Sequence, residues 1–278
     1  MASREKLLKS QSAEGQKEIL KLTSDARKAV ELQVIDAVNK GNFAQAATVR
    51  DGLYKGIAEE YVRLNRGVDD WTVKRSGTVS KAWHTLAIDD LPTAKAGSTF
   101  GQFSKKYLDD IIGKINPSTI GEKVGVGLNP QIGGMLNEDI RAIRTAVSNT
   151  IRTGALTGMT NPQLSAEMRR ATQAIKPGAL FIDKAGRKWN SDSYFSMLNR
   201  TLHANVARET YNSTVVDAGF DLVRVDGSSS DPDSPCLPWE GKILSVSGTS
   251  KKYPSLAEAE ATGLHHPNCI HTESVYIP

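Results

Sequence analysis

Residues 191–225 have the sequence SDSYFSMLNRTLHANVARETYNSTVVDAGFDLVRV, and a change of pattern within them decides the fold. The first part predicts a helix that starts after Ser193 and continues to about Ala218, with Gly219 as its stop. Its apolar residues recur at the spacing of one helix face, namely Phe195, Leu198, Leu202, Val206 and Tyr211. Residues 220–225 are rich in β-forming residues and predict a strand. The chain is therefore expected to change from helical to mixed structure at Gly219.

The segment after this strand continues the mixed pattern. Residues 242–246 and 272–277 are two further candidate strands, and residues 256–261 predict a short helix. Glycine, serine and proline are frequent between these elements, as is typical of turns. We therefore expect residues 190–278 to form a small α+β module at the C-terminus.

The N-terminal part of the chain predicts a helical hairpin over residues 1–66. A first amphipathic helix, whose apolar face includes Ile19, should end near Gly41. A second helix should begin with Asn42 as its N-cap and continue to about Arg66. These two helices would lie against each other through their apolar faces.

Residues 67–99 predict an irregular connector. The residues that interrupt helical periodicity there are Asp69, Asp70, Gly77, Pro92 and Gly97. Helical spacing returns in a central helical region, residues 100–189, where apolar stripes begin at Phe100, Leu136 and Leu164. The expected fold class is α+β, with a predominantly α-helical body and the small C-terminal module.

The composition is that of an ordinary globular chain. Of the 278 residues, 39% are hydrophobic and 24% are charged. No apolar run approaches the roughly 18 residues of a membrane span, and the charged residues 1–6 are not followed by the apolar segment of a signal peptide. Synthesis in the cytoplasm and no membrane partner are expected. The net charge of +4 is mild, whereas a dedicated nucleic-acid binder usually has a dense basic stripe.

Thiol and imidazole side chains gather near the C-terminus. Zinc prefers these ligands in a tetrahedral arrangement, and one short turn can supply two of them. Pro267 should stiffen such a turn. The candidate metal ligands are Cys236, His266, Cys269 and His271, with His265 as the substitute for His266.

Three interpretations of this cluster remain open at the level of the sequence. The first is a structural zinc ion. The second is a metal-free cluster with buried thiols and imidazoles that hydrogen-bond the backbone. The third is a disulfide between Cys236 and Cys269, which a reducing cytoplasm disfavours. The residues after Cys236 cannot bind metal, so the first half of the cluster offers a single ligand.

The order of several motifs resembles the terminal module of phage minor head proteins of the Mu F-like and minor capsid protein 2-like families. The resemblance covers about residues 190–278. It is carried by Asn199-Arg200-Thr201, Ala204-Asn205, Arg208 and Gly219, by Gly241-Lys242, and by Gly263-Leu264-His265-His266-Pro267-Asn268-Cys269-Ile270-His271. Relatives commonly have arginine where this chain has Ile270, and many have a second cysteine where it has Trp239. The second difference removes a potential metal ligand.

The resemblance implies a non-enzymatic protein present in few copies in the head of a tailed phage. Its implied partners are the portal protein and the major capsid protein, and its implied role is in head morphogenesis or DNA ejection. The implied location is the virion, where contact with packaged DNA is conceivable. No catalytic residue is expected.

Three other classes of protein fit the sequence less well. An internal DNA-binding or ejection protein would bind DNA with a steep salt dependence. A zinc hydrolase would need a general base beside the metal, and the chain has no His-Glu-x-x-His motif. An ADP-ribosyltransferase is suggested only by Glu258-Ala259-Glu260 and Gly248-Thr249-Ser250, which lie too close together for two elements of that fold.

Overall fold

The computed structural model describes residues 2–39, 46–92 and 188–278, together with scattered positions between 109 and 182. The chain divides into two compact units. Unit 1 comprises Met1–Glu18, Asp70–Val124 and Ser196–Pro278, and unit 2 comprises Ile19–Asp69 and Gly125–Phe195. The described residues are mostly helical, with a three-stranded antiparallel sheet near the C-terminus. The predicted α+β class with a predominantly helical body is confirmed.

Two long helices form the N-terminal part of the chain. Helix α1 (Ala2–Asn39) ends close to the predicted stop, while the predicted N-cap Asn42 lies outside the described residues. Helix α2 (Ala46–Asp90) contributes, like α1, to both units. No described helix is both long enough and apolar enough to cross a membrane.

The prediction of an irregular connector over residues 67–99 is wrong for residues 67–90, because α2 continues to Asp90. The prediction failed because the buried face of this stretch is partly polar, which hides its periodicity. Its buried residues include Val68, Trp71, Thr72, Arg75, Ser76, Val79, Ser80, Trp83, His84 and Ala87, at spacings of three and four. Pro92 does follow the end of the helix, and residues 93–99 lie outside the described residues. The domain boundaries inferred from the sequence remain a prediction.

Helix α7 (Ser191–Asp217) has a capping signal at each end. At its start the side-chain oxygen of Asn190 accepts a hydrogen bond from the Ser193 backbone at 2.7 Å. At its end Phe220 N donates to Val215 O and Gly219 N donates to Val216 O, while Gly219 has a φ of +84°. This is the Schellman motif, in which a left-handed glycine ends the helix, and it confirms Gly219 as the predicted stop.

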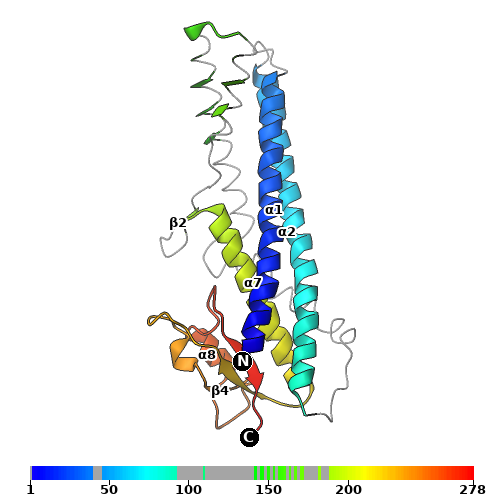
Figure 1. The fold of residues 1–278 in the computed structure, drawn as a ribbon, viewed down its shortest axis with the longest axis vertical. Helices are drawn as coiled ribbons and strands as arrows, with labels where there is room; N and C mark the ends of the chain where they lie inside the picture. The colour runs from blue at the N-terminus through cyan, green and yellow to red at the C-terminus, as the bar shows by residue number, and fades with distance from the viewer. Residues whose placement is uncertain are drawn as a thin grey trace. The chain divides into compact units, whose positions relative to one another are not determined.

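Within unit 1, α7 packs against the start of α1, the end of α2 and the sheet (Figure 1). The Tyr211 hydroxyl accepts a hydrogen bond from Val275 N at 3.0 Å, and the Tyr211 ring meets Trp83 edge to face. Both apolar and polar residues of α7 are therefore buried. The buried apolar residues of its part in unit 1 are Met197, Leu198, Leu202, Ala204, Val206, Ala207, Tyr211 and Val215.

The C-terminal sheet has the strand order β4-β3-β5, and both pairs are antiparallel. Its strands are β3 (Leu222–Asp226), β4 (Ile243–Ser245) and β5 (Thr272–Val275). β4 and β5 lie within predicted strands and are shorter, whereas β3 starts two residues later than predicted and ends one residue later. Helix α8 (Leu256–Ala261) coincides with its prediction, and Ser255 and Glu258 form the capping box that starts it.

The central helical region is described only in part. Helical residues are described at position 109 and at several positions between 141 and 171, and the rest of the three predicted helices lies outside the described residues. Unit 2 also contains a small antiparallel pair that the sequence did not predict, β1 (Phe181–Ile182) with β2 (Lys188–Trp189).

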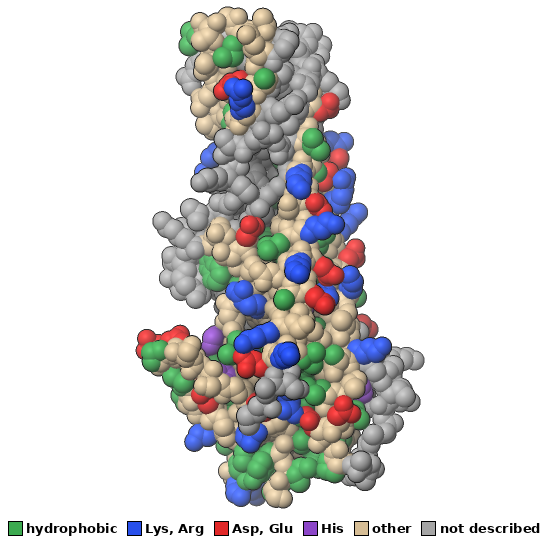
Figure 2. Space-filling model, viewed as in Figure 1, with side chains coloured by type: hydrophobic (Ala, Val, Ile, Leu, Met, Phe, Trp, Pro, Cys, Tyr) green, Lys and Arg blue, Asp and Glu red, His purple; other side chains and the backbone are tan. Residues whose placement is uncertain are grey.

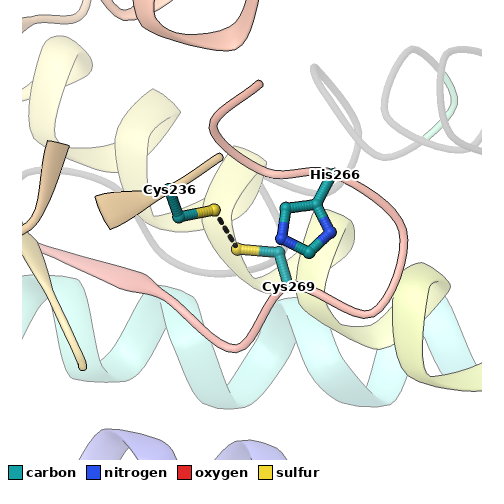
Figure 3. Close-up of side chains that lie close together, drawn as sticks. All are labelled: Cys236, His266 and Cys269. Atoms are coloured by element: carbon teal, nitrogen blue, oxygen red, sulfur yellow. Dashed lines mark hydrogen bonds between the residues drawn. The ribbon is translucent and has the colours of Figure 1, made fainter. Parts of the chain in front are cut away.

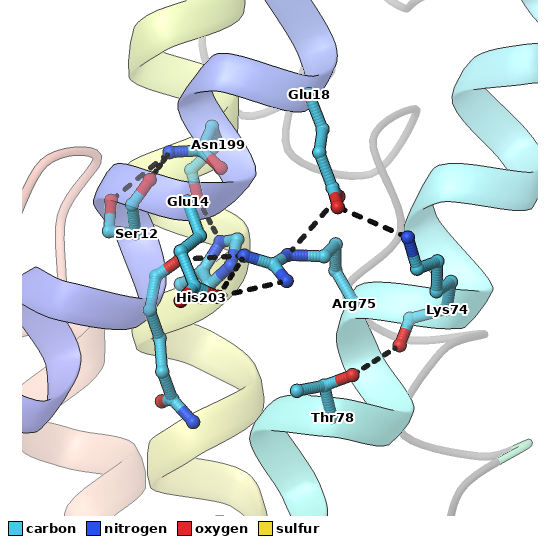
Figure 4. A network of polar contacts seen from close by, with 9 residues as sticks. Ser12, Glu14, Glu18, Lys74, Arg75, Thr78, Asn199 and His203 are labelled. Carbon is cyan, nitrogen blue, oxygen red and sulfur yellow. Dashed lines mark hydrogen bonds and ion pairs between the residues drawn. The ribbon is translucent and has the colours of Figure 1, made fainter.

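A partly buried polar network joins α1, α2 and α7 inside unit 1 (Figure 4). Arg75, which is 5% exposed, is paired with Glu14 and Glu18 of α1. Beside it, His203 Nδ1 donates to Asn199 O at 2.8 Å, and burial lowers the pKa of His203 to about 4. The neutral imidazole is therefore the form that fits the folded protein near neutral pH.

We expect the stability of unit 1 to fall between about pH 6.5 and about pH 4 because of His203. In this window the unfolded chain binds a proton at His203 and the folded chain does not, so the free energy of unfolding decreases with falling pH, by up to about 3 kcal/mol. Urea unfolding at about pH 7 and about pH 4.5 should show a smaller decrease for His203→Gln, which cannot titrate. Parallel pH profiles for the two proteins would contradict this prediction.

Candidate metal centre

A tight turn holds two of the predicted ligands together. Cys269 N donates to His266 O at 2.9 Å, Pro267 follows His266, and Asn268 has a φ of +69°. Proline at the second position and a left-handed asparagine at the third are the features of a type II β-turn. The His-Pro-Asn-Cys segment therefore places its histidine and cysteine close in space for reasons that are local to its sequence.

The third ligand comes from a different part of the chain. Cys236 precedes the 3-10 helix η2 (Leu237–Trp239) and its sulfur lies 3.5 Å from the sulfur of Cys269. Figure 3 shows the two sulfur atoms facing each other, with the His266 ring beside them. Potential ligand atoms of Cys236, His266 and Cys269 all lie within 4.8 Å of one another, and both thiols are free and buried. The structure thus brings together three of the four predicted ligands.

The fourth predicted ligand, His271, lies at the edge of this group. Its Nδ1 is 3.4 Å from Cys269 Sγ, and its Nε2 is 2.9 Å from a carboxylate oxygen of Glu240. Glu240 also accepts a hydrogen bond from Ser229 N at 2.6 Å, so it connects His271 to the loop that precedes Cys236.

His265, the predicted substitute, points to other partners. Its side chain is 5% exposed and makes ion pairs with Glu260 at 3.0 Å and with Glu273 at 2.6 Å. Burial opposes its positive charge, but the two carboxylates outweigh burial and raise the pKa of His265 above its ordinary value. His266 and not His265 is therefore the imidazole beside the two thiols.

The thiols influence each other's protonation. A hydrogen bond between the two sulfur atoms lowers the pKa of Cys236 to about 6, and burial works against this shift. The same hydrogen bond raises the pKa of Cys269 above its ordinary value. Cys236 therefore loses its proton more readily than Cys269, and the resulting thiolate is the form of cysteine that binds metals.

Three side chains of α7 hold the turn and the start of β5. Arg200 Nε donates to the Asn268 side chain at 2.9 Å, and Thr201 accepts from Asn268 N at 3.1 Å. Arg208, which is 4% exposed, donates to His271 O at 3.1 Å. The sequence marked these residues only through the family resemblance. Thr201 and Arg208 belong to a set of buried polar residues on α7, and the apolar stripe of this helix does not distinguish them from the others.

A polar cleft of about 450 Å³ opens beside the cluster. Its lining includes His266, Arg208, Glu209 and Glu260. Glu260 is paired with His265, and Glu258 accepts hydrogen bonds from Ser255 in the capping box of α8. Both members of the Glu-x-Glu pair therefore have contacts that stabilise local structure.

Comparison with known proteins identifies the C-terminal half of the chain. Residues 141–278 match the family model of phage minor capsid protein 2. No curated protein and no solved structure matches the chain. The matched residues include α7, the three-stranded sheet and the Cys/His cluster. Residues 141–278 therefore belong to the phage minor capsid protein 2 family.

Proposed function

We propose that the protein is a minor head component of a tailed bacteriophage that attaches to portal or major capsid subunits and supports head assembly or DNA ejection. The observation that carries this proposal is the family match over residues 141–278. Membership of a minor capsid family supports a role connected with the phage capsid. The portal and capsid subunits are the partners that we propose for this role.

The charge distribution favours protein contacts over DNA binding. On the face shown in Figure 2, basic and acidic side chains are interspersed rather than gathered in one basic stripe. Inside unit 1, Lys74 and Arg75 are both paired with Glu18, so these two cations are not free to contact phosphates. A dedicated DNA binder would present unpaired cations along one surface.

We also propose that the protein is not an enzyme. The acidic residues nearest to the Cys/His cluster already have partners: Glu240 contacts His271, and Glu273 contacts His265. A general base needs access to a substrate proton, whereas the Glu273 side chain is 0% exposed. These contacts support a structural use of the carboxylates.

The proposal is tested in the phage that encodes the protein. A nonsense codon in its gene should lower the infectious titre by orders of magnitude, and wild-type protein supplied in trans should restore it. Quantitative mass spectrometry of purified heads should find few copies per particle, and chemical cross-linking should join them to portal or major capsid subunits. Absence of the protein from both procapsids and virions would overturn the proposal.

The same particles separate assembly from ejection and from DNA binding. Empty or aberrant heads in the mutant support a role in assembly, whereas DNA-filled heads that adsorb without releasing DNA support a role in ejection. DNA affinity of the purified protein that persists at physiological salt, without cross-links to portal or capsid subunits, would instead identify an internal DNA-binding protein.

A further inference from the structure

We propose that Cys236, His266, Cys269 and His271 bind one structural zinc ion. The ion would tie the loop before β4 to the turn before β5, two segments that are far apart in the sequence. This inference rests on the geometry of the cluster and does not depend on the proposed role in the phage head.

The spacing of the donor atoms matches the edges of a zinc tetrahedron. With Zn–S bonds of about 2.3 Å and Zn–N bonds of about 2.0–2.1 Å, tetrahedral angles place two sulfurs about 3.8 Å apart and a sulfur and a nitrogen about 3.6 Å apart. The observed distances are 3.5 Å between the sulfurs of Cys236 and Cys269 and 3.4 Å between Cys269 Sγ and His271 Nδ1. Ligand atoms of Cys236, His266 and Cys269 lie within 4.8 Å of one another, and His271, which contacts Cys269, would move toward the other two to complete the site.

The spacing does not match a disulfide. A disulfide holds its sulfur atoms about 2.05 Å apart, so the 3.5 Å separation would have to shorten by about 1.5 Å. Both cysteines are free in the structure. The cysteines are therefore arranged as neighbouring ligands rather than as a covalent pair.

The outer hydrogen bonds orient both imidazoles toward the thiols. His266 Nδ1 donates to Pro267 O at 2.8 Å, which leaves Nε2 as its ligand atom. His271 Nε2 contacts the Glu240 carboxylate, which leaves Nδ1 toward Cys269. Zinc-binding histidines almost always donate their second nitrogen to a backbone carbonyl or a carboxylate, and the two histidines show one case of each.

The surroundings support a closed, structural site. Four protein ligands leave no open position for substrate, as in structural zinc sites. The cleft lined by His266 offers a path by which the ion can enter. The three strands of the tail are short, of five, three and four residues. Small modules of this kind often depend on a metal or a disulfide for stability.

The test measures metal in the full-length protein. Protein purified under reducing conditions from zinc-supplemented medium, without chelators, should contain about one zinc per chain by elemental mass spectrometry. Cys269→Ser and His271→Ala should lose most of this zinc, whereas the matched control His84→Gln, outside the cluster, should keep it. Chelation should lower the melting temperature of the wild-type protein but not of Cys269→Ser.

A spectroscopic measurement keeps the test independent of variants that fail to fold. Cobalt exchanged into the wild-type protein should give the intense visible absorption of a tetrahedral ion and the near-ultraviolet charge-transfer band of thiolate ligands. Wild-type protein that binds neither zinc nor cobalt while both thiols remain titratable would overturn the proposal. Recovery of a Cys236–Cys269 disulfide in place of metal would also overturn it.

Discussion

Trp83→Ala should destabilise the protein by about 3–5 kcal/mol, the largest effect that we expect from a single substitution. Trp83 is 0% exposed in unit 1, where its ring meets Tyr211 of α7 edge to face with centroids 6.4 Å apart. Its Nε1 also donates to the Gln11 side chain of α1 at 3.1 Å. Removal of the indole leaves a cavity at the contact of three helices and an acceptor on Gln11 without its donor.

Urea unfolding followed by circular dichroism checks this prediction. Val73→Ala is the matched control, because Val73 lies on the same helix but is 55% exposed, and its loss should change stability by at most about 0.5 kcal/mol. The free energy of unfolding of Trp83→Phe should lie between those of Trp83→Ala and Val73→Ala, because phenylalanine keeps much of the apolar contact but loses the hydrogen bond to Gln11. Equal stabilities of Trp83→Ala and Val73→Ala would contradict the contact between α2 and α7 described for unit 1.

Gly15→Ala should destabilise the protein by about 3 kcal/mol, although alanine is the better helix former. A Cβ atom at Gly15 would lie 2.4 Å from Asn199 Oδ1 and 2.4 Å from His203 Cε1. Neither side chain can move away easily, because Asn199 donates to Ser12 O and His203 donates to Asn199 O. The new methyl group would therefore push α1 away from α7 and disturb the partly buried polar network.

Gly77→Ala provides a control of opposite sign. Gly77 lies inside α2, and a Cβ atom there would meet nothing within 4 Å. Replacing this half-buried helical glycine with alanine should stabilise the protein by about 0.5–1 kcal/mol, because the new Cβ meets open space. The two variants should therefore differ by about 4 kcal/mol in urea unfolding. Equal stabilities would show that α1 and α7 are not in close contact at Gly15.

The sequence predicted the elements whose signals are local. Gly219 ends α7 because only a left-handed residue completes the Schellman motif there, and Ser255 with Glu258 starts α8 through a capping box. The His266–Cys269 turn is equally local, since Pro267 and Asn268 favour its geometry. Each of these features depends on residues within about six positions of one another, so the pattern alone identifies it.

The tertiary structure decided the features that depend on distant partners. In residues 67–90 of α2, polar residues such as Arg75 and His84 take positions on the buried face because they find partners on α1 and α7, and they interrupt the apolar periodicity of this stretch. His266 rather than His265 lies beside the thiols because His265 forms an ion pair with Glu273. The approach of Cys236 to Cys269 depends on the fold of the whole tail. The physical reason is common to all three: a local pattern fixes backbone conformation, whereas the partner of a buried polar side chain is set by which segments the fold brings together.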